Sequence, residues 1–306
     1  MRILLTGGSG MVGRALLRCA AGRDGIELVA PTRSDYDLSD TRATAAMIRD
    51  IAPEAVIHGA ARVGGIQANV ADPAGFLVDN MAVALNTIDA ARKGGVRRLI
   101  YLGSSCMYPK DLERPLREED VLTAPLEPTN EGYALAKIAG ARLATYIARQ
   151  DGLAYRTVIP SNLYGPGDSF DPQRSHLVAA VIAKTVAAVR DHAASIEIWG
   201  DGMARREFLY VDDLAGFVLD HIVHSERLPD MINVGAGGDH SVNDYYRVVA
   251  DLAGFRGEFR HDLARPTGMK QKLMDSTKAQ ALGWRPATDL RAGLQKTIAF
   301  YEAGTP

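Results

Sequence analysis

The first half of the chain alternates short apolar runs with longer amphipathic stretches. The short runs, rich in β-branched residues and leucine, predict buried strands at residues 2–5, 26–30, 55–58, 99–102 and 155–159. The longer stretches predict helices at residues 11–21, 42–50, 76–92 and 133–150. Strands that alternate with helices usually form a parallel sheet with helices on both faces. We therefore predict an α/β fold with a doubly wound parallel sheet.

The second half has a less regular pattern. It predicts a helix at residues 175–190, a strand at 195–199, and a strand end followed by a helix at 208–221. Ser241 is a candidate cap for a helix that runs to residue 253. Loops are marked by Pro166, Pro172, Pro266 and Pro286. Since no low-complexity linker separates the halves, we expect them to pack together with a cleft between them.

Composition narrows the class of protein. The chain has 306 residues, 47% apolar and 24% charged, as is typical of globular proteins. The net charge of −2 gives no overall basic field for nucleic acid or an anionic membrane. We find no signal peptide and no membrane-spanning run. Cys19 and Cys106, outside any CxxC motif, indicate neither a disulfide framework nor a zinc site, so we expect a reducing, cytoplasmic setting and no metal.

A glycine-rich loop joins the first predicted strand to the first predicted helix. It reads GGSGMVG, with Gly7, Gly10 and Gly13 at GxxGxxG spacing. Glycine allows a tight turn and a close approach to a pyrophosphate, and the helix start offers the free N–H groups of residues such as Met11 and Val12. The loop predicts a dinucleotide site on a Rossmann-type fold. A glycine turn without a ligand is the alternative.

The residues after the second predicted strand bear on the choice between NAD and NADP. Arg33 lies twenty residues past Gly13. NAD enzymes usually place Asp or Glu near this point to bind the ribose 2′-hydroxyl, whereas arginine suits a 2′-phosphate. Arg33 therefore predicts NADP(H), with a solvated surface arginine as the alternative. Asp35 is close enough to compete as a ligand of a 2′-hydroxyl.

Three side chains form a candidate catalytic set. Tyr133 and Lys137 make a YxxxK motif whose i, i+4 spacing puts both on one helix face. The ammonium of Lys137 is expected to lower the pKa of the phenol and to bind ribose hydroxyls of the cofactor. Ser104 follows the fourth predicted strand, where ligands of such sheets bind. We predict that Ser104 donates to a substrate carbonyl and that Tyr133 supplies its proton.

These motifs resemble those of the extended short-chain dehydrogenase/reductase family and, within it, the GDP-L-fucose synthase group. The resemblance covers nearly the whole chain. It rests on AARVGGIQAN (60–69), GSSCMYPK (103–110), LEPTNEGYALAK (126–137), NLYGP (162–166), SH (175–176), WG (199–200), REFL (206–209) and GMKQK (268–272), which leads to Asp275. The chain departs from the family at Gly132 (usually proline), Ser9 (basic in some members), Lys184 (often arginine) and Thr267 (usually aspartate).

The resemblance implies a two-stage reaction on a GDP-linked 4-keto-6-deoxy-hexose. Carbons 3 and 5 are epimerised, and NADPH then reduces carbon 4. The 4-keto group acidifies the neighbouring C–H bonds, so epimerisation needs a base on one face of the ring and an acid on the other. The family pattern implies Cys106 and His176 for these roles, since thiol and imidazole exchange protons near neutral pH. It also implies that His176 contributes to the cofactor site. Without the resemblance, both residues would be interpreted as structural.

The resemblance also implies a substrate site and an assembly. Its expected residues are Ser105, Asn162, Lys184, Trp199, Arg206 and Lys272. Lys184 and Arg206 suit the diphosphate. Trp199 is also compatible with a core position, and Lys272 with a solvated one. A homodimer is implied through the helices at 76–92 and 133–150. The product is GDP-L-fucose or a relative, because enzymes that make GDP-colitose or GDP-heptoses share the same chemical core.

Two other functions stay open at this point. A pure nucleotide-sugar epimerase would hold NAD(H) tightly, whereas Arg33 and the pair Cys106 and His176 favour an epimerase-reductase. A non-catalytic NADP(H) sensor would be expected to lose Tyr133, which is present. We expect residues 1–165 to form the NADP-binding Rossmann domain, with part of 207–237 returning to it. Residues 166–306 are expected to form mainly a smaller α/β domain that binds the sugar nucleotide.

Overall fold

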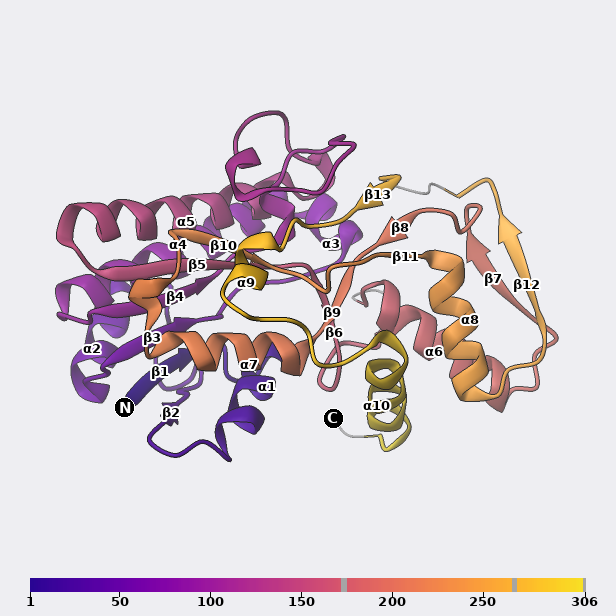
Figure 1. Ribbon diagram of the computed structural model, residues 1–306, viewed down its shortest axis with the longest axis horizontal. Coiled ribbons are helices and arrows are strands. Elements are labelled where there is room, and N and C mark those ends of the chain that lie inside the picture. The colour runs from indigo at the N-terminus through magenta and orange to yellow at the C-terminus, as the bar shows by residue number, and fades with distance from the viewer. Residues whose placement is uncertain (172–174, 266–268, 305–306) are drawn as a thin grey trace.

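The computed structural model describes residues 1–171, 175–265 and 269–304 (Figure 1). Pro172, Pro266, Thr267 and Gly268, which entered the sequence argument, lie outside the described residues. The first part of the chain forms β1 (Arg2–Thr6), α1 (Met11–Ala20), β2 (Glu27–Val29), α2 (Thr41–Ile51), β3 (Ala55–His58), α3 (Ile66–Ala71), α4 (Pro73–Lys93), β4 (Arg98–Leu102), the 3-10 turns η1 (Ser105–Met107), η2 (Glu118–Asp120) and η3 (Pro128–Asn130), α5 (Glu131–Asp151) and β5 (Ala154–Pro160).

The second part of the chain is built from shorter elements. They are β6 (Asn162–Tyr164), α6 (Leu177–Arg190), β7 (Ser195–Trp199), β8 (Arg205–Arg206), β9 (Phe208–Tyr210), α7 (Val211–Ile222), η4 (Ser225–Arg227), β10 (Met231–Val234), β11 (His240–Ser241), α8 (Val242–Ala253), β12 (Glu258–Asp262), β13 (Gln271–Lys272), α9 (Thr277–Ala281) and α10 (Leu290–Glu302). No helix within the described ranges is long and apolar enough to cross a membrane.

Six strands form one sheet in the order β10-β5-β4-β3-β1-β2, and each neighbouring pair is parallel. The predicted doubly wound parallel sheet is confirmed, and each of its five predicted strands ends within one residue of the observed bounds. The chain moves from β1 to β2 on one side and returns to β3 on the other. Open α/β sheets bind ligands in the crevice outside the carboxyl ends of strands at such a reversal.

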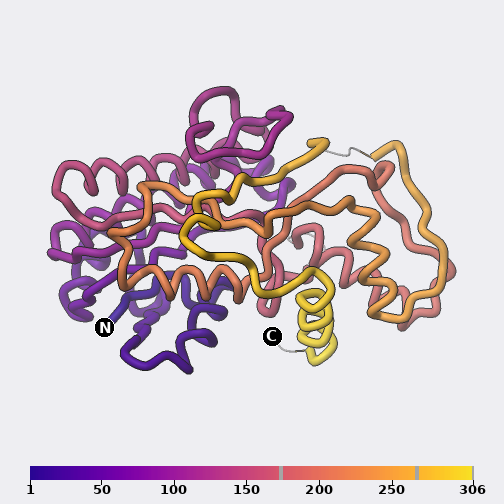
Figure 2. Tube along the Cα trace, in the orientation of Figure 1, coloured from indigo at the N-terminus to yellow at the C-terminus, as the bar shows by residue number. Residues whose placement is uncertain are grey.

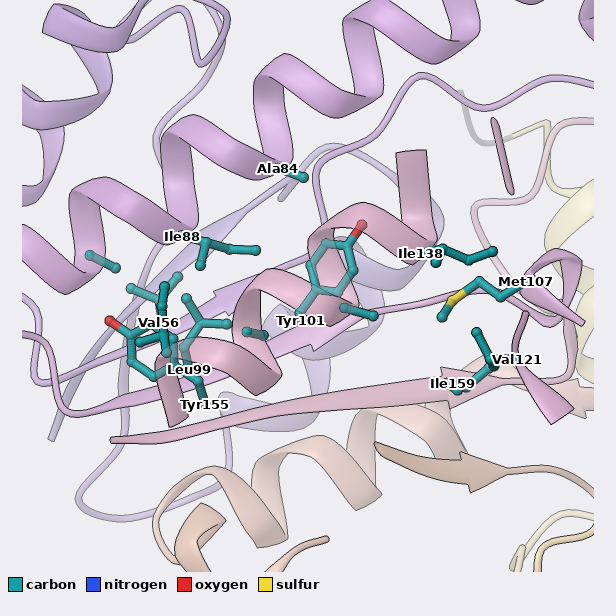
Figure 3. Close-up of a cluster of buried hydrophobic side chains, with 14 of the residues drawn as sticks. Val56, Ala84, Ile88, Leu99, Tyr101, Met107, Val121, Ile138, Tyr155 and Ile159 are labelled. Carbon is teal, nitrogen blue, oxygen red and sulfur yellow. The ribbon is translucent and has the colours of Figure 1, made fainter. Parts of the chain in front are cut away.

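Helices cover both faces of this sheet, with α4 and α5 on one side and α1 and α7 on the other (Figure 1). Strands buried on both faces need apolar side chains at successive positions, which explains their continuous apolar runs. Figure 3 shows Leu99 and Tyr101 of β4 packed with Ile88 of α4 and Ile138 of α5. A Cβ atom on Gly140 of α5 would lie 2.6 Å from the Tyr101 ring, so this glycine lets α5 approach β4 closely.

Much of the second part, including α6, α8, β7 and β12, extends to the right of the sheet (Figure 2) and packs around its own apolar cluster, whereas α7, β10 and α9 pack with the sheet. Three small sheets are formed here: β11-β8-β13, β12-β7 and β6-β9. The predicted helix at 175–190 begins at Leu177, and Ser241 caps α8 by accepting a hydrogen bond from the backbone N–H of Asp244. β10 crosses back to the large sheet and pairs with β5. The arrangement sets β8 and β13 side by side near the carboxyl edge of that sheet (Figure 1).

Candidate active site

The glycine loop has the geometry of a pyrophosphate cradle. Gly7 has φ +79°, and a Cβ atom on it would lie 2.7 Å from the backbone nitrogen of Ala60, at the neighbouring strand end. A Cβ atom on Gly13 would lie 2.2 Å from the Gly7 oxygen. Gly10 caps α1 without a side-chain hydrogen bond, so the first-turn N–H groups, including that of Met11, have no side-chain cap. These residues fit a dinucleotide phosphate.

Arg33 and Asp35 both lie in the loop after β2, but their side chains differ in exposure and in hydrogen bonding. The Arg33 side chain is 87% exposed, and its guanidinium is 3.8 Å from the Asp37 carboxylate. The Asp35 carboxylate instead accepts hydrogen bonds from the Thr32 backbone N–H at 2.8 Å and the Thr32 hydroxyl at 2.7 Å. These hydrogen bonds lower the pKa of Asp35. Asp35 is therefore engaged by its own loop, while Arg33 is accessible to a phosphate.

Lys137 is buried beneath the end of β4. It is 4% exposed, and its Nζ donates a hydrogen bond of 2.8 Å to the Leu102 carbonyl oxygen. Burial lowers the pKa of Lys137 to about 8, although the nearby Cys106 acts in the opposite direction. Its Nζ lies 5.8 Å from the centroid of the Tyr133 ring. The lysine and tyrosine of the YxxxK motif thus share one face of α5, as the spacing predicted.

Tyr133 differs from the sequence-based expectation in its acidity. Burial raises its pKa, Cys106 adds to the rise, and a hydrogen bond with the Ser104 side chain lowers it. The expected lowering by Lys137 is wrong, because burial disfavours the phenolate more than the surroundings favour it. The phenol keeps its proton at neutral pH. This state suits a group that gives a proton to a carbonyl oxygen.

Cys106 joins the Ser104, Tyr133 and Lys137 set. It lies in η1 directly after β4, and its backbone N–H donates to the Ser104 hydroxyl at 3.2 Å. Its Sγ accepts a hydrogen bond of 3.3 Å from Nδ2 of Asn130. η1 packs against α5, the helix that carries Tyr133 and Lys137, and Cys106 acts electrostatically on both of these residues. The structure therefore brings a thiol into the Ser-Tyr-Lys cluster.

His176 lies at the N-cap position of α6. His176 is accessible to solvent on one side, while protein atoms surround the rest of its ring. The resulting desolvation lowers the pKa of His176, and the charge of Lys272 lowers it further. Lys272 of β13 pairs in register with Arg206 of β8, so these two cations share one small sheet. Within the described ranges, no hydrogen bond joins the His176 side chain to Cys106 or Tyr133.

The predicted substrate-binding residues include three cations. Among the described residues, no ion pair joins Lys184, Arg206 or Lys272 to a carboxylate, although most other arginines here have one. Arg206 is partly buried, its guanidinium donates a hydrogen bond of 2.8 Å to the Arg205 carbonyl oxygen, and burial lowers its pKa. A buried guanidinium needs a counter-charge. Arg206 and Lys272, which share one small sheet, are therefore candidate anion ligands, and Lys184 lies beside Trp199.

The other predicted substrate residues are placed as follows. Trp199, at the end of β7, is 50% exposed, which excludes the core alternative. Lys184 Nζ lies 5.4 Å from its ring centroid. Asn162 begins β6 and is partly buried, and its register partner is Phe208. Ser105 is 4% exposed, so its hydroxyl has little access to a ligand in this conformation.

Sequence reasoning missed two residues at the site. Arg265 lies with its guanidinium carbon 4.9 Å from the Trp199 centroid, where β12 and β7 run side by side. Asn130, directly before α5, contacts Cys106. A polar residue before a helix is usually a cap, so this position carries no sequence signal for a contact with a thiol. Gly132, where the family usually has proline, lies so close to α4 that a Cβ atom would be 2.5 Å from the Pro73 oxygen.

The parallel sheet, the glycine loop and the Ser104, Tyr133 and Lys137 cluster define a nucleotide-binding enzyme of the extended short-chain dehydrogenase/reductase class. The chain belongs to the NAD dependent epimerase/dehydratase family, whose model matches residues 3–235.

Comparison with individual proteins narrows the group. The chain is 48% identical over 303 residues to the GDP-L-fucose synthase of Azorhizobium caulinodans, covering 99% of this chain and 97% of the relative. It is 44% identical to the GDP-L-colitose synthase of Yersinia pseudotuberculosis, covering 98% of each. Its fold matches a GDP-D-glycero-L-gluco-heptose synthase from Campylobacter jejuni, solved in the presence of NADPH, with a TM-score of 0.89, 29% identity and coverage of 99% and 98%. The resemblance to GDP-L-fucose synthases is confirmed.

Proposed function

We propose that the protein is an NADPH-dependent epimerase-reductase that acts on a GDP-4-keto-6-deoxy-hexose and forms GDP-L-fucose or a close relative. The observation that carries this function is the position of Cys106. A reductase needs only a proton donor for the carbonyl oxygen, but here a thiol lies in η1, which packs against the helix that carries Tyr133 and Lys137. The names of the relatives agree with this reading, since both sequence relatives are synthases of GDP-linked deoxy sugars.

The cofactor is NADP(H), which supplies the hydride for carbon 4. Gly7, Gly10 and Gly13 allow its pyrophosphate to approach the start of α1, where Met11 and Val12 offer N–H groups. Arg33 meets the 2′-phosphate, which agrees with the exposure of its side chain and with the engaged carboxylate of Asp35. Lys137 and His176 complete the cofactor site. The heptose synthase of similar fold was solved in the presence of NADPH.

Reduction of carbon 4 uses the cluster at the end of β4. The Ser104 hydroxyl donates a hydrogen bond to the substrate carbonyl oxygen. Tyr133, whose raised pKa keeps the phenol protonated, gives its proton to that oxygen as negative charge develops. The Lys137 ammonium, held by the Leu102 carbonyl, stabilises the phenolate that remains.

Epimerisation at carbons 3 and 5 uses Cys106 and His176. The keto group at carbon 4 stabilises the carbanion formed at either neighbour as an enolate. One of the two residues removes the proton on one ring face, and the other returns a proton on the opposite face. Cys106 lies on the α5 side of the site and His176 at the start of α6, so the two groups come from different parts of the fold.

The sugar nucleotide binds on the side formed by α6, β7, β8 and β13. Lys184, Arg206 and Lys272 hold the diphosphate, which supplies the negative charge that their surroundings lack. Trp199 packs beside the nucleotide and Asn162 contacts the sugar, whereas Ser105 is too buried in this conformation to contact the sugar directly. We divide the chain at residue 165 into a cofactor domain, to which part of 207–237 returns, and a substrate domain. β10, which joins the large sheet, supports this division.

We infer a cytoplasmic homodimer whose interface is formed by α4 and α5. These helices pack against each other and expose Val78, Leu135 and Tyr146. Apolar side chains of this kind are typical of helical dimer interfaces.

Turnover of a panel of GDP-4-keto sugars tests the proposed function. Purified protein is mixed with NADPH and each sugar, and products are identified by mass spectrometry and sugar analysis. We expect NADPH-dependent formation of GDP-L-fucose from GDP-4-keto-6-deoxy-mannose. Preferred turnover of a dideoxy or heptose substrate would assign the protein to the colitose or heptose group instead, as the second relative and the structural match allow. Tightly bound NAD(H), seen by absorbance, without net reduction would indicate a pure epimerase.

A further inference from the structure

Asn130 has an unusual position for a residue at the start of a helix. It is the N-cap of α5, where an asparagine side chain normally accepts a hydrogen bond from a first-turn N–H group. Here it makes no such cap. Its Nδ2 instead donates to Cys106 Sγ at 3.3 Å, and its buried Oδ1 has no hydrogen-bond partner among the residues described. The side-chain amide of Asn130 therefore hydrogen-bonds to the thiol and does not cap the helix.

The protonation state of sulfur decides what this contact does. A neutral thiol is a weak acceptor, whereas a thiolate accepts N–H groups strongly. A donor aimed at Sγ therefore favours the thiolate and fixes the direction of its remaining lone pairs. The N-terminus of α5, which carries Asn130, adds a partial positive charge nearby. Tyr133 and Lys137 of α5 also interact electrostatically with Cys106, and the variants proposed below leave both of them unchanged.

We propose that Asn130 is the positioning residue of the epimerisation step, which holds Cys106 Sγ in place and stabilises its thiolate through the Nδ2 hydrogen bond. This proposal rests on the proposed function for its catalytic consequence. The contact with the thiol does not depend on that function and can be measured without any substrate.

Alkylation of Cys106 measures the thiolate directly. Cys19→Ser leaves Cys106 as the single cysteine, and mass spectrometry follows its reaction with iodoacetamide at several pH values. In Asn130→Ala the pH midpoint of alkylation should rise by about one unit, because a hydrogen bond to a charged group changes such an equilibrium roughly tenfold. Asn130→Asp replaces the donor with an acceptor of the same shape and should raise the midpoint further.

Thr129→Ala is the matched control. Thr129 lies in the same turn and its hydroxyl bonds Glu127, not Cys106. The control should keep the midpoint of the Cys19→Ser parent. An unchanged midpoint in folded Asn130→Ala, or in Asn130→Asp if the alanine variant does not fold, would overturn the proposal. An equal rise in Thr129→Ala would also overturn it, since loosening of the turn would then explain the effect.

Exchange of solvent deuterium into the sugar ring gives the catalytic readout. Asn130→Ala should lower exchange at carbons 3 and 5 about tenfold while NADPH affinity stays within twofold of the parent. Unchanged exchange overturns the positioning role. Absence of exchange in the unaltered protein overturns the proposed function instead, and the alkylation midpoints then still decide whether Asn130 stabilises the thiolate.

Discussion

The two sides of the active site are built in opposite ways. The proton-transfer side rests on long, buried elements: Lys137 is 4% exposed and bonded to the end of β4, and Tyr133 lies one turn before it on α5. The substrate side rests on short elements, with Arg206 and Lys272 on two-residue strands and Lys184 on the exposed face of α6. The residues proposed to react are therefore held by the protein, whereas the cations proposed to bind the substrate form no ion pair among the described residues.

This contrast has a consequence for specificity. We expect a change of sugar to require changes on the proposed substrate side, while the buried cluster stays the same. Relatives named for fucose, colitose and heptose products accord with such a division. The following predictions test whether the two sides can be altered separately, starting with the largest effect.

Tyr133→Phe should abolish reduction without affecting substrate binding. The change removes the oxygen that gives its proton to the carbonyl, and we expect a loss in kcat of at least about a hundredfold, the usual scale for a general acid. Steady-state NADPH oxidation measures it. Tyr146→Phe, an exposed tyrosine on the same helix, is the control and should keep full activity. A Tyr133→Phe enzyme with near normal kcat would remove this residue from its role.

Arg206→Ala should damage binding and spare chemistry. Loss of a charged hydrogen bond to the diphosphate should raise KM for the GDP-sugar by about tenfold to a hundredfold with a smaller change in kcat. The neighbouring Arg205, whose guanidinium pairs with Asp239, provides the control variant Arg205→Ala. If kcat fell and KM stayed constant, the division between the two sides would be wrong.

Arg33→Ala should separate the two forms of the cofactor. Only NADPH carries the 2′-phosphate, so its dissociation constant should rise about tenfold while that of NADH changes little. Fluorescence titration measures both constants, and Arg42→Ala, an exposed arginine on α2, serves as the control. Equal losses for both cofactors would show that Arg33 does not contact the phosphate.

The pH dependence of reduction should report Lys137. Burial disfavours the ammonium and lowers the pKa of Lys137 from 10.5 to about 8, so the charge is present below that pH and lost above it. Since the raised pKa of Tyr133 keeps the phenol protonated, kcat should fall severalfold between about pH 7.5 and 8.5 and should not rise. A pH profile of kcat at saturating substrate measures this. A rate that climbs through pH 9 would contradict the assignment.

Long helices could be predicted from the sequence because their pattern of apolar positions repeats over several turns. The predicted helix at 133–150 corresponds to α5, Glu131–Asp151, and the YxxxK pair shares its face as expected. The pairing of Arg206 with Lys272 was not predictable, since strands of two residues carry no period and lie far apart in the sequence. Composition gave no sign that burial would raise the pKa of Tyr133, or that the Asn130 side chain would leave its helix for Cys106.

The central claim is that one cluster of side chains contains both the groups that reduce carbon 4 and the thiol that takes part in epimerisation. Cys106→Ser tests it directly, because serine keeps the shape but is a much weaker acid than cysteine and a poor base here. The measurement is deuterium incorporation from solvent into GDP-4-keto-6-deoxy-mannose without NADPH, followed by mass spectrometry. The account predicts far less incorporation than in the unaltered protein, with NADPH binding retained and His176→Asn leaving partial exchange at one carbon. Full incorporation in Cys106→Ser would contradict the account and leave a simple 4-keto reductase.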